Sequence, residues 1–407
     1  MTSSHATASH EQRPTARVGE VFAAFLKLGL TSFGGPTAHL GFFREEFVSK
    51  RKWLSESAYA DVVALCQFLP GPASSQVGMA LGLQRAGSLG LLAAWFAFTL
   101  PSAILLVVFA LAANSLDSLL GDGWIIGLKA ATVAVVAHAV LGMARTLAPD
   151  APRATLAVAA MAIVLLFPSP IVQVAVILAA GLVGLLWLRN SAEAPEPTDF
   201  SFARHSRRSA LICLAIFVLL LVGLPVAAAI FDNGVLRLIE IFYSSGALVF
   251  GGGHVVLPML ETQTVGAGLV EHDAFLAGYA AAQAVPGPLF TFAAYLGMVF
   301  QSGPSGLLGA GIALVAIFVP SALLVAAALP FWQRLRHWAS ARRALLGVNA
   351  AVVGLLAAAL YSPVFVQGAS SIPTLVLATL GFVGLHSWNI PPWMLVVASA
   401  LIGWVLF

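Results

Sequence analysis

The hexapeptide Gln67-Phe68-Leu69-Pro70-Gly71-Pro72 returns 216 residues later as Gln283-Ala284-Val285-Pro286-Gly287-Pro288. Both copies lie in apolar segments, and a Pro-Gly-Pro sequence breaks a helix because proline and glycine disfavour the helix interior. The repetition therefore predicts a broken helix at the same position in each of two related halves.

Three other motifs recur at nearly the same separation, with offsets of 217, 219 and 220 residues. Four landmarks that keep register over this distance indicate an internal repeat. The further pairs are Phe33-Gly34-Gly35 with Phe250-Gly251-Gly252, Pro101-Ser102-Ala103 with Pro320-Ser321-Ala322, and Gly127 to Ala131 with Gly347 to Ala351.

The composition indicates a protein whose solvent is lipid. Of its 407 residues, 60% are hydrophobic and 9% are charged, whereas soluble domains carry about 25% charged residues. Apolar runs of membrane-spanning length include Leu89 to Ala113, Ala210 to Ile230 and Leu307 to Leu329. We therefore expect an all-α polytopic membrane protein. The polar stretch from Met1 to Arg17 is read as a cytoplasmic tail, because it lacks the apolar core of a signal peptide.

Lys and Arg residues cluster in segments that the positive-inside rule places in the cytoplasm. With the N-terminus on that side, Val18 to Phe43 and Ser55 to Gln84 must each enter the membrane and return. They turn at Phe33-Gly34-Gly35-Pro36 and at the first Pro-Gly-Pro sequence, and their short arms predict re-entrant or broken helices.

A single connecting helix between the copies gives the second half the opposite orientation, so the repeat is predicted to be inverted. The expected organisation is a cytoplasmic tail at 1–17, a first repeat at 18–189, a cytoplasmic linker at 190–208, a connecting transmembrane helix at 209–231 and a second, inverted repeat at 232–407.

Inverted repeats with interrupted helices are typical of secondary transporters, which bind their substrate near the membrane midplane between the repeats. Exchanging the conformations of two inverted halves exchanges the inside-open and outside-open states. The sequence has no phosphate-binding GxxxxGK[ST] loop, so we expect transport to be driven by ion gradients or the membrane potential.

The paired Phe-Gly-Gly turns and Gln-x-x-Pro-Gly-Pro motifs, spread over two fused halves, resemble the chromate ion transporter family in its long-chain form. The resemblance extends from about Val21 to Leu406. It implies chromate efflux across the bacterial inner membrane and chromate resistance. A carrier of sulfate or another inorganic anion is the alternative, as is a channel-like anion conduit. The expected partners are chromate, sulfate as the similar anion, and the lipid bilayer.

Each Pro-Gly-Pro turn is a candidate oxyanion site, because the following half-helix presents free N–H groups and the positive end of its dipole. In the first half we expect Pro72 to be the first helical residue. The alternative is that both turns only kink their helices. The substrate-binding candidates here are Gly71, Ser74, Ser75 and Gln76 in the first half and Gly287 and Thr291 in the second.

The glutamines before the turns, Gln67 and Gln283, are further candidates, with either substrate contact or helix stabilisation as their role. The Phe-Gly-Gly turns add Gly34, Gly35, Gly251 and Gly252, whose backbone could approach an ion or, alternatively, allow close helix crossing.

Lys129 and Lys27 are candidates for the counter-charge of an anion, because lysine within a membrane is costly and commonly functional. Asn349 is the repeat partner of Lys129 and a candidate as well. The alternatives for Lys129 are an ion pair with an acidic residue or snorkelling to the interface.

Asp61, His138 and His254 are candidates for proton coupling, against the alternatives of an ion-pair partner for Asp61 and packing residues for the histidines. No His or Cys has metal-ligand spacing, so no metal or cofactor is expected. Scattered single reactive residues do not indicate an enzyme. The excess of basic residues is assigned to membrane topology, so no nucleic acid is expected as a partner.

Overall fold

The structure, a computed structural model, describes residues 14–188, 206–250, 254, 256–332 and 338–407, and these residues contain helices but no β-strand. Among them, six helical segments are long and apolar enough to cross a membrane. The predicted all-α polytopic membrane fold is confirmed.

The first half and the connecting helix contain nine helical elements. They are α1 (Pro14–Thr31), α2 (Gly35–Arg44), the π-helix η1 (Glu45–Lys50), α3 (Glu56–Phe68), α4 (Ala73–Leu120), α5 (Gly123–Leu147), α6 (Ala151–Leu166), α7 (Pro170–Trp187) and the connecting α8 (Arg207–Phe231).

The second half repeats this order. Its elements are α9 (Gly234–Leu248), α10 (Val256–Thr264), α11 (His272–Ala284), η3 (Leu289–Thr291), α12 (Phe292–Met298), α13 (Gly306–Ala328), η4 (Leu329–Phe331), α15 (Ala339–Ala359), η5 (Leu360–Phe365), α16 (Val366–Gly368), α17 (Ile372–Ser387) and α18 (Pro392–Leu406).

The predicted helix breaks are present in the described chain. α1 ends at Thr31 before the Phe33-Gly34-Gly35 turn, and α3 ends at Phe68 before the first Pro-Gly-Pro turn. α4 departs from helical geometry at Ala86 and Gly87, directly after Arg85. The re-entrant arm and the membrane-spanning arm are therefore joined by a kink rather than by a loop.

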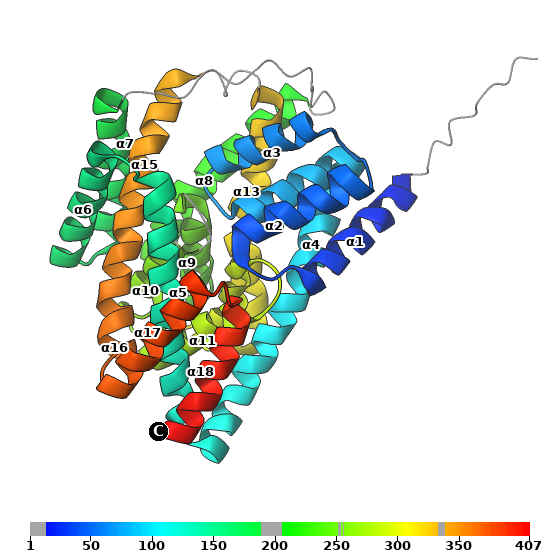
Figure 1. Cartoon of the computed structure of the whole chain (residues 1–407). Helices are drawn as coiled ribbons and strands as arrows, with labels where there is room; N and C mark the ends of the chain where they lie inside the picture. Colours follow the sequence, from blue (N-terminus) through cyan, green and yellow to red (C-terminus); the bar gives the residue numbers. More distant parts are fainter. Residues whose placement is uncertain (1–13, 189–205, 251–253, 255, 333–337) are drawn as a thin grey trace, which may run out of the picture.

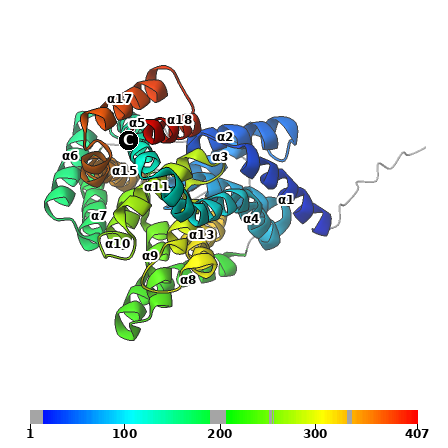
Figure 2. The same cartoon turned by 90° about the horizontal axis from the view of Figure 1, so that it is seen from below.

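The helices of both halves mix to form two bundles, which Figures 1 and 2 show from two directions. The turn bundle, α1–α4 with α9–α13, carries both Pro-Gly-Pro turns. The hairpin bundle consists of α5–α7 and α15–α18, in which α5 packs against α17 and α18 while α15 packs against α6 and α7. Each long helix therefore packs against the helical hairpin of the opposite half.

Glycine residues allow a close approach in both of these helix pairs, α5 with α18 and α15 with α7. A Cβ on Gly403 of α18 would lie 2.7 Å from Gly127 Cα of α5, and a Cβ on Gly184 of α7 would lie 2.9 Å from Gly347 Cα of α15. Gly127 and Gly347 are repeat partners, so both halves use the same close helix crossing. The repeat partners α5 and α15 run in opposite directions in Figure 1, as an inverted repeat requires.

Local sequence signals start several helices. The Asp150 carboxylate accepts a hydrogen bond from the Arg153 N–H at 3.0 Å at the start of α6, and Asn233 Oδ1 accepts from Val235 N–H at 2.8 Å at the start of α9. These side chains satisfy backbone donors that lack a partner in the first helical turn.

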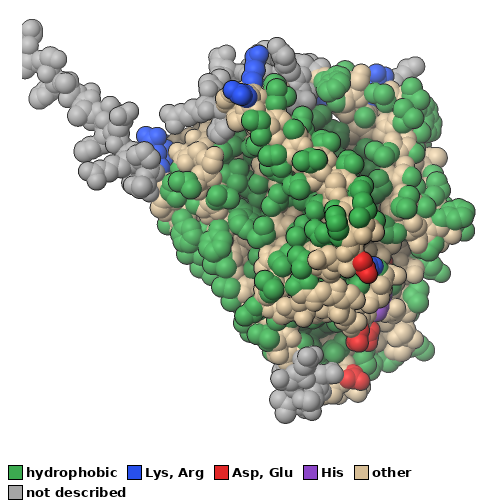
Figure 3. Space-filling view, turned by 180° about the vertical axis from the view of Figure 1, so that it is seen from behind, with side chains coloured by type: hydrophobic (Ala, Val, Ile, Leu, Met, Phe, Trp, Pro, Cys, Tyr) green, Lys and Arg blue, Asp and Glu red, His purple; other side chains and the backbone are tan. Residues whose placement is uncertain are grey.

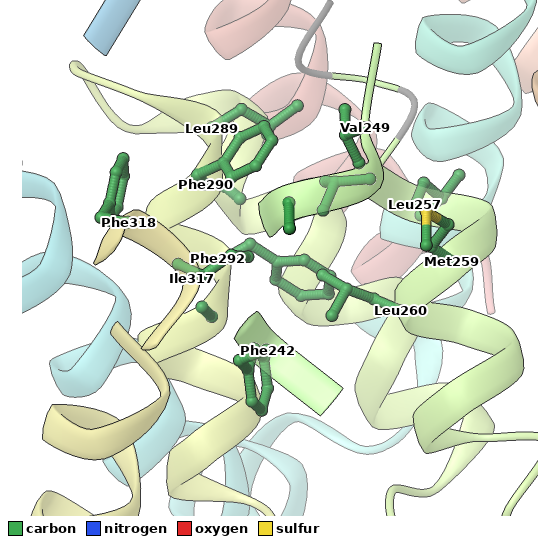
Figure 4. Close-up of a cluster of buried hydrophobic side chains, with 14 of the residues drawn as sticks. Phe242, Val249, Leu257, Met259, Leu260, Leu289, Phe290, Phe292, Ile317 and Phe318 are labelled. Atoms are coloured by element: carbon green, nitrogen blue, oxygen red, sulfur yellow. The ribbon is translucent and has the colours of Figure 1, made fainter. Parts of the chain in front are cut away.

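A buried aromatic cluster holds the second broken helix in place, as Figure 4 shows. Phe242 of α9, Phe290 of η3, Phe292 of α12 and Phe318 of α13 are all buried to at least 99%. These rings fix η3 and α12, and with them the second Pro-Gly-Pro turn, against α9 and α13.

The surface is consistent with lipid as the solvent. Figure 3 shows hydrophobic side chains over most of one face, with Lys and Arg along its upper edge and acidic side chains lower down. The connecting helix α8 buries only 11% of its most apolar window, so most of its side chains face outward. An apolar helix exposed in this way is stable only in a bilayer.

We predict that Gly127→Ala destabilises the protein by about 1–3 kcal/mol, the usual cost of overpacking. The added Cβ would overlap the Ser399 carbonyl oxygen on α18 and force the two helices apart. Gly142→Ala in the same helix is the matched control, because a Cβ there meets no atom within 4 Å. Thermal unfolding of the detergent-solubilised variants should show a lower midpoint for Gly127→Ala alone, and equal midpoints would contradict the close crossing.

Candidate functional site

The first Pro-Gly-Pro turn is bonded to the second half of the chain. Gly71 has a left-handed φ of 121°, and its N–H donates to the Val249 carbonyl oxygen at 2.6 Å. Val249 directly precedes the second Phe-Gly-Gly motif. The glycine is required, because a Cβ at Gly71 would lie 2.5 Å from Ser321 Oγ.

The second turn makes the reciprocal contacts. Gly287 has a φ of 96°, and its N–H donates at 2.9 Å to the carbonyl oxygen of Ser32, which directly precedes the first Phe-Gly-Gly motif. A Cβ at Gly287 would lie 2.8 Å from Ser102 Oγ. Ser102 and Ser321 are themselves repeat partners. Each broken helix therefore ends against the turn and the Pro-Ser-Ala segment of the opposite half.

The structure places the start of α4 one residue later than predicted. α4 begins at Ala73, and the Pro72 carbonyl oxygen accepts the first helical bond from Gln76 N–H at 2.9 Å. Pro72 is therefore the N-cap residue rather than the first helical residue. Its counterpart Pro288 precedes the short 3₁₀ turn η3, where Thr291 Oγ1 donates to the Pro288 carbonyl oxygen at 2.7 Å.

The sequence suggested that the side-chain amide of Gln76 binds substrate. In the structure this amide stabilises the first turn. Gln76 Nε2 donates to the Pro70 carbonyl oxygen at 2.6 Å, and Ser321 Oγ lies 3.5 Å from the same nitrogen. The donor capacity of Gln76 is therefore used within the protein. Its Oε1 atom is buried without a partner among the described residues and can only accept.

His39 links the first Phe-Gly-Gly turn to the start of α4. Its Nδ1 lies 3.4 Å from Ser74 Oγ, and its Nε2 lies 3.2 Å from the Ser32 carbonyl oxygen that also binds Gly287. Gly34 and Gly35 shape this turn with φ values of 101° and 76°. The equivalent glycines Gly251 and Gly252 lie outside the described residues.

Several buried polar atoms around the two turns have no hydrogen-bond partner within the described part of the chain. They are Ser75 Oγ in α4, Ser32 Oγ after α1 and Thr99 Oγ1 in the spanning arm of α4. All three can donate a hydrogen bond and none carries a charge. Neutral donors beside a helix N-terminus can bind an anion without holding it too tightly for release.

Lys129 lies away from the turns. Its Nζ forms an ion pair with Asp273 Oδ1 at 2.6 Å, in the first turn of α11. Gln283 is ten residues further along α11, which is about 15 Å at 1.5 Å per residue. The ion pair is the alternative that the sequence left open for Lys129, and this geometry does not place the lysine as a counter-charge at the turns.

The other lysine and the two remaining polar candidates also lie outside the cluster of free donors. Lys27 is 59% exposed, and its Nζ lies 3.4 Å from the buried carboxylate of Glu46. Gln67 is exposed at the end of α3, and Asn349 is half-buried in α15 of the hairpin bundle.

The three proton-coupling candidates lie on different elements. His254 Nδ1 lies 2.9 Å from the hydroxyl oxygen of Tyr279, which also interacts with the Gln283 side chain. The His138 ring in α5 lies 6.0 Å from that of His386 in α17, measured between centroids. Asp61 is buried in α3.

Sequence reasoning gave no role to several residues of this site. Ser102 and Ser321 lie within the recurring Pro-Ser-Ala motif, which was the available signal for them. Ser32, His39, Thr99 and Tyr279 carry no motif, and only the folded arrangement brings them to the turns. No group of His, Cys, Asp and Glu that could hold a metal ion occurs in the described part of the chain.

Comparison with known proteins places this architecture. The chromate transporter family model matches twice, at residues 19–185 and 236–404. The chain is 29% identical to a chromate transport protein of Pseudomonas aeruginosa, covering 97% of this chain and 94% of that protein.

Two further relatives are a probable chromate transport protein of Synechococcus elongatus and a chromate transport protein of Cupriavidus metallidurans. The first is 27% identical over 97% of this chain and 96% of its own length, and the second is 25% identical over 99% and 96%. No solved structure matches the chain significantly. Since the family model covers both halves, with the recurring turns inside each match, the chain belongs to the chromate transporter family.

Proposed function

We propose that the protein is a secondary transporter that exports chromate from the bacterial cytoplasm through an oxyanion site at the two Pro-Gly-Pro turns. The observation that carries the site is the group of neutral hydroxyl donors buried near the two turns, Ser75, Ser32 and Thr99, without partners in the described chain. Family membership supports chromate as the substrate.

The electrostatics favour a transported rather than a tightly held anion. The polar side chains described at the turns are those of serine, threonine, glutamine and histidine. Dipoles and hydroxyl groups recognise the charge and shape of a tetrahedral anion, so sulfate should compete with chromate. The Asp273 carboxylate lies about 15 Å along α11 from Gln283 and is paired with Lys129, so its repulsion of an anion at the turns should be weak.

The orientation follows from charge. Most Lys and Arg side chains on the face shown in Figure 3 lie along its upper edge, and the positive-inside rule makes that edge cytoplasmic in an inner membrane. A negative-inside potential then drives a dianion outward by about 2.3 kcal/mol per charge per 100 mV. This energy suffices for export without ATP.

Everted membrane vesicles containing the protein should take up radiolabelled chromate with saturation, because this direction corresponds to export. Sulfate should inhibit the uptake, and collapse of the potential should slow it. Stimulation by chromate on the opposite side would separate a carrier from a channel-like conduit. Absence of uptake by well-expressed protein would remove chromate as the substrate.

Ser75→Ala should raise the KM for chromate roughly ten-fold, because a hydrogen bond to a charged group contributes about 1.5–3 kcal/mol. The substitution removes no internal hydrogen bond of the described chain, so folding should be unaffected. Ser209→Ala is the control, since Ser209 is exposed at the start of α8 and its hydroxyl bonds only locally. Vesicle uptake measures both variants, and an unchanged KM for Ser75→Ala would exclude its hydroxyl from the site.

A further inference from the structure

We propose that the Lys129–Asp273 ion pair latches the two bundles together on one side of the membrane, and that α3 closes the opposite side by docking on α15. In that second conformation Ser57 faces Asn349 and the ion pair is broken. The inference rests on the proposed transport function, because it describes how access to the turns alternates.

The latched side is a packed interface between α11 of the turn bundle and α5 of the hairpin bundle. Lys129 Nζ and Asp273 Oδ1 are 2.6 Å apart, and one turn further Thr132 Oγ1 lies 3.5 Å from the Leu276 carbonyl oxygen. Leu276 and Ala280 of α11 are 0% and 1% exposed. The middle of this face of α11 is therefore covered, while Asp273 at its start remains partly exposed.

The equivalent face of α3 is uncovered. Ser57, Ala60, Ala64 and Gln67 are all exposed, and their spacing of three, four and three residues places them on one side of the helix. They correspond, at the repeat offset of 216 residues, to Asp273, Leu276, Ala280 and Gln283 of α11. The contrast is clearest at the middle of the face, where Leu276 and Ala280 are buried in α11 and Ala60 and Ala64 are exposed in α3.

The inverted repeat identifies what should cover α3. α11 packs against α5, and the repeat partner of α5 is α15. Lys129 corresponds to Asn349 at an offset of 220, and Asp273 corresponds to Ser57. Exchanging the conformations of the two halves therefore brings α3 onto α15, and the small side chains of Ala60 and Ala64 allow a close approach.

The two contacts differ in charge, so they should stabilise the two conformations to different extents. Lysine and aspartate close one side, whereas serine and asparagine close the other. The charged side is the predicted periplasmic side, because α11 begins there in the inverted half. The ion pair should favour the conformation seen in the structure, and only modestly so, because Asp273 is 61% exposed.

Cross-linking between the halves tests this directly. In a Cys66→Ala/Cys213→Ala background with a protease site inserted into the predicted linker 190–208, Ser57→Cys/Asn349→Cys is treated with a short bismaleimide in native membranes. Cleavage followed by denaturing electrophoresis then reports whether the halves stay joined. Lys129→Cys/Asp273→Cys is the matched pair for the latched side, and each single cysteine variant is a negative control.

Both pairs should cross-link, and adding Asp273→Asn to Ser57→Cys/Asn349→Cys should raise its yield roughly two- to five-fold, the effect of losing one partly exposed ion pair. Lys129→Gln should act equally, because it removes the same pair, and Asp273→Glu should leave the yield unchanged. A Ser57–Asn349 pair that never cross-links, or a yield indifferent to both neutral variants, would overturn the proposal. Since cross-linking needs no chromate, a failure of the substrate assignment would leave this result intact.

Discussion

The structure depends on two backbone hydrogen bonds, Gly71 N–H to Val249 and Gly287 N–H to Ser32. A helix broken inside a membrane exposes amide groups to a medium that cannot hydrogen-bond them, at a cost of several kcal/mol each. Here one amide of each break, that of the turn glycine, is satisfied by the half to which it does not belong. The geometry of both turns therefore depends on the assembly of the two halves.

This dependence decides what the sequence could predict. The turns and the repeat follow from proline and glycine, whose backbone restrictions are local, so the motifs at Gly71 and Gly287 identified both breaks. The use of each side chain depends on segments distant in the chain. Lys129 looked like a counter-charge, yet its partner is Asp273 in the other half, a pair that only packing brings together. Gln76 looked like a substrate donor, yet its amide binds Pro70 within the same turn and lies 3.5 Å from Ser321 Oγ of the other half.

The repeat is more symmetric in its backbone than in its chemistry. Both halves make the same kind of glycine contact, Gly127 with α18 and Gly347 with α7. These contacts hold the hairpin bundle together. Lys129 and Asn349 occupy equivalent positions with different charge. Conserving the shape allows two related states, while differing side chains set their relative free energies.

The charged groups lie apart from the proposed anion site, so anion affinity and the change of conformation depend on different residues. A fixed cation at the turns would strengthen anion binding in both states alike, and a ligand bound equally by two states does not shift their equilibrium. The Lys129–Asp273 ion pair instead lies where the two bundles meet. Asp273 is ten residues before Gln283 along α11. In the proposed latch the two charges act on the free-energy difference between conformations. The proposed neutral site and charged interface together suit a carrier, because the anion must leave as readily as it enters.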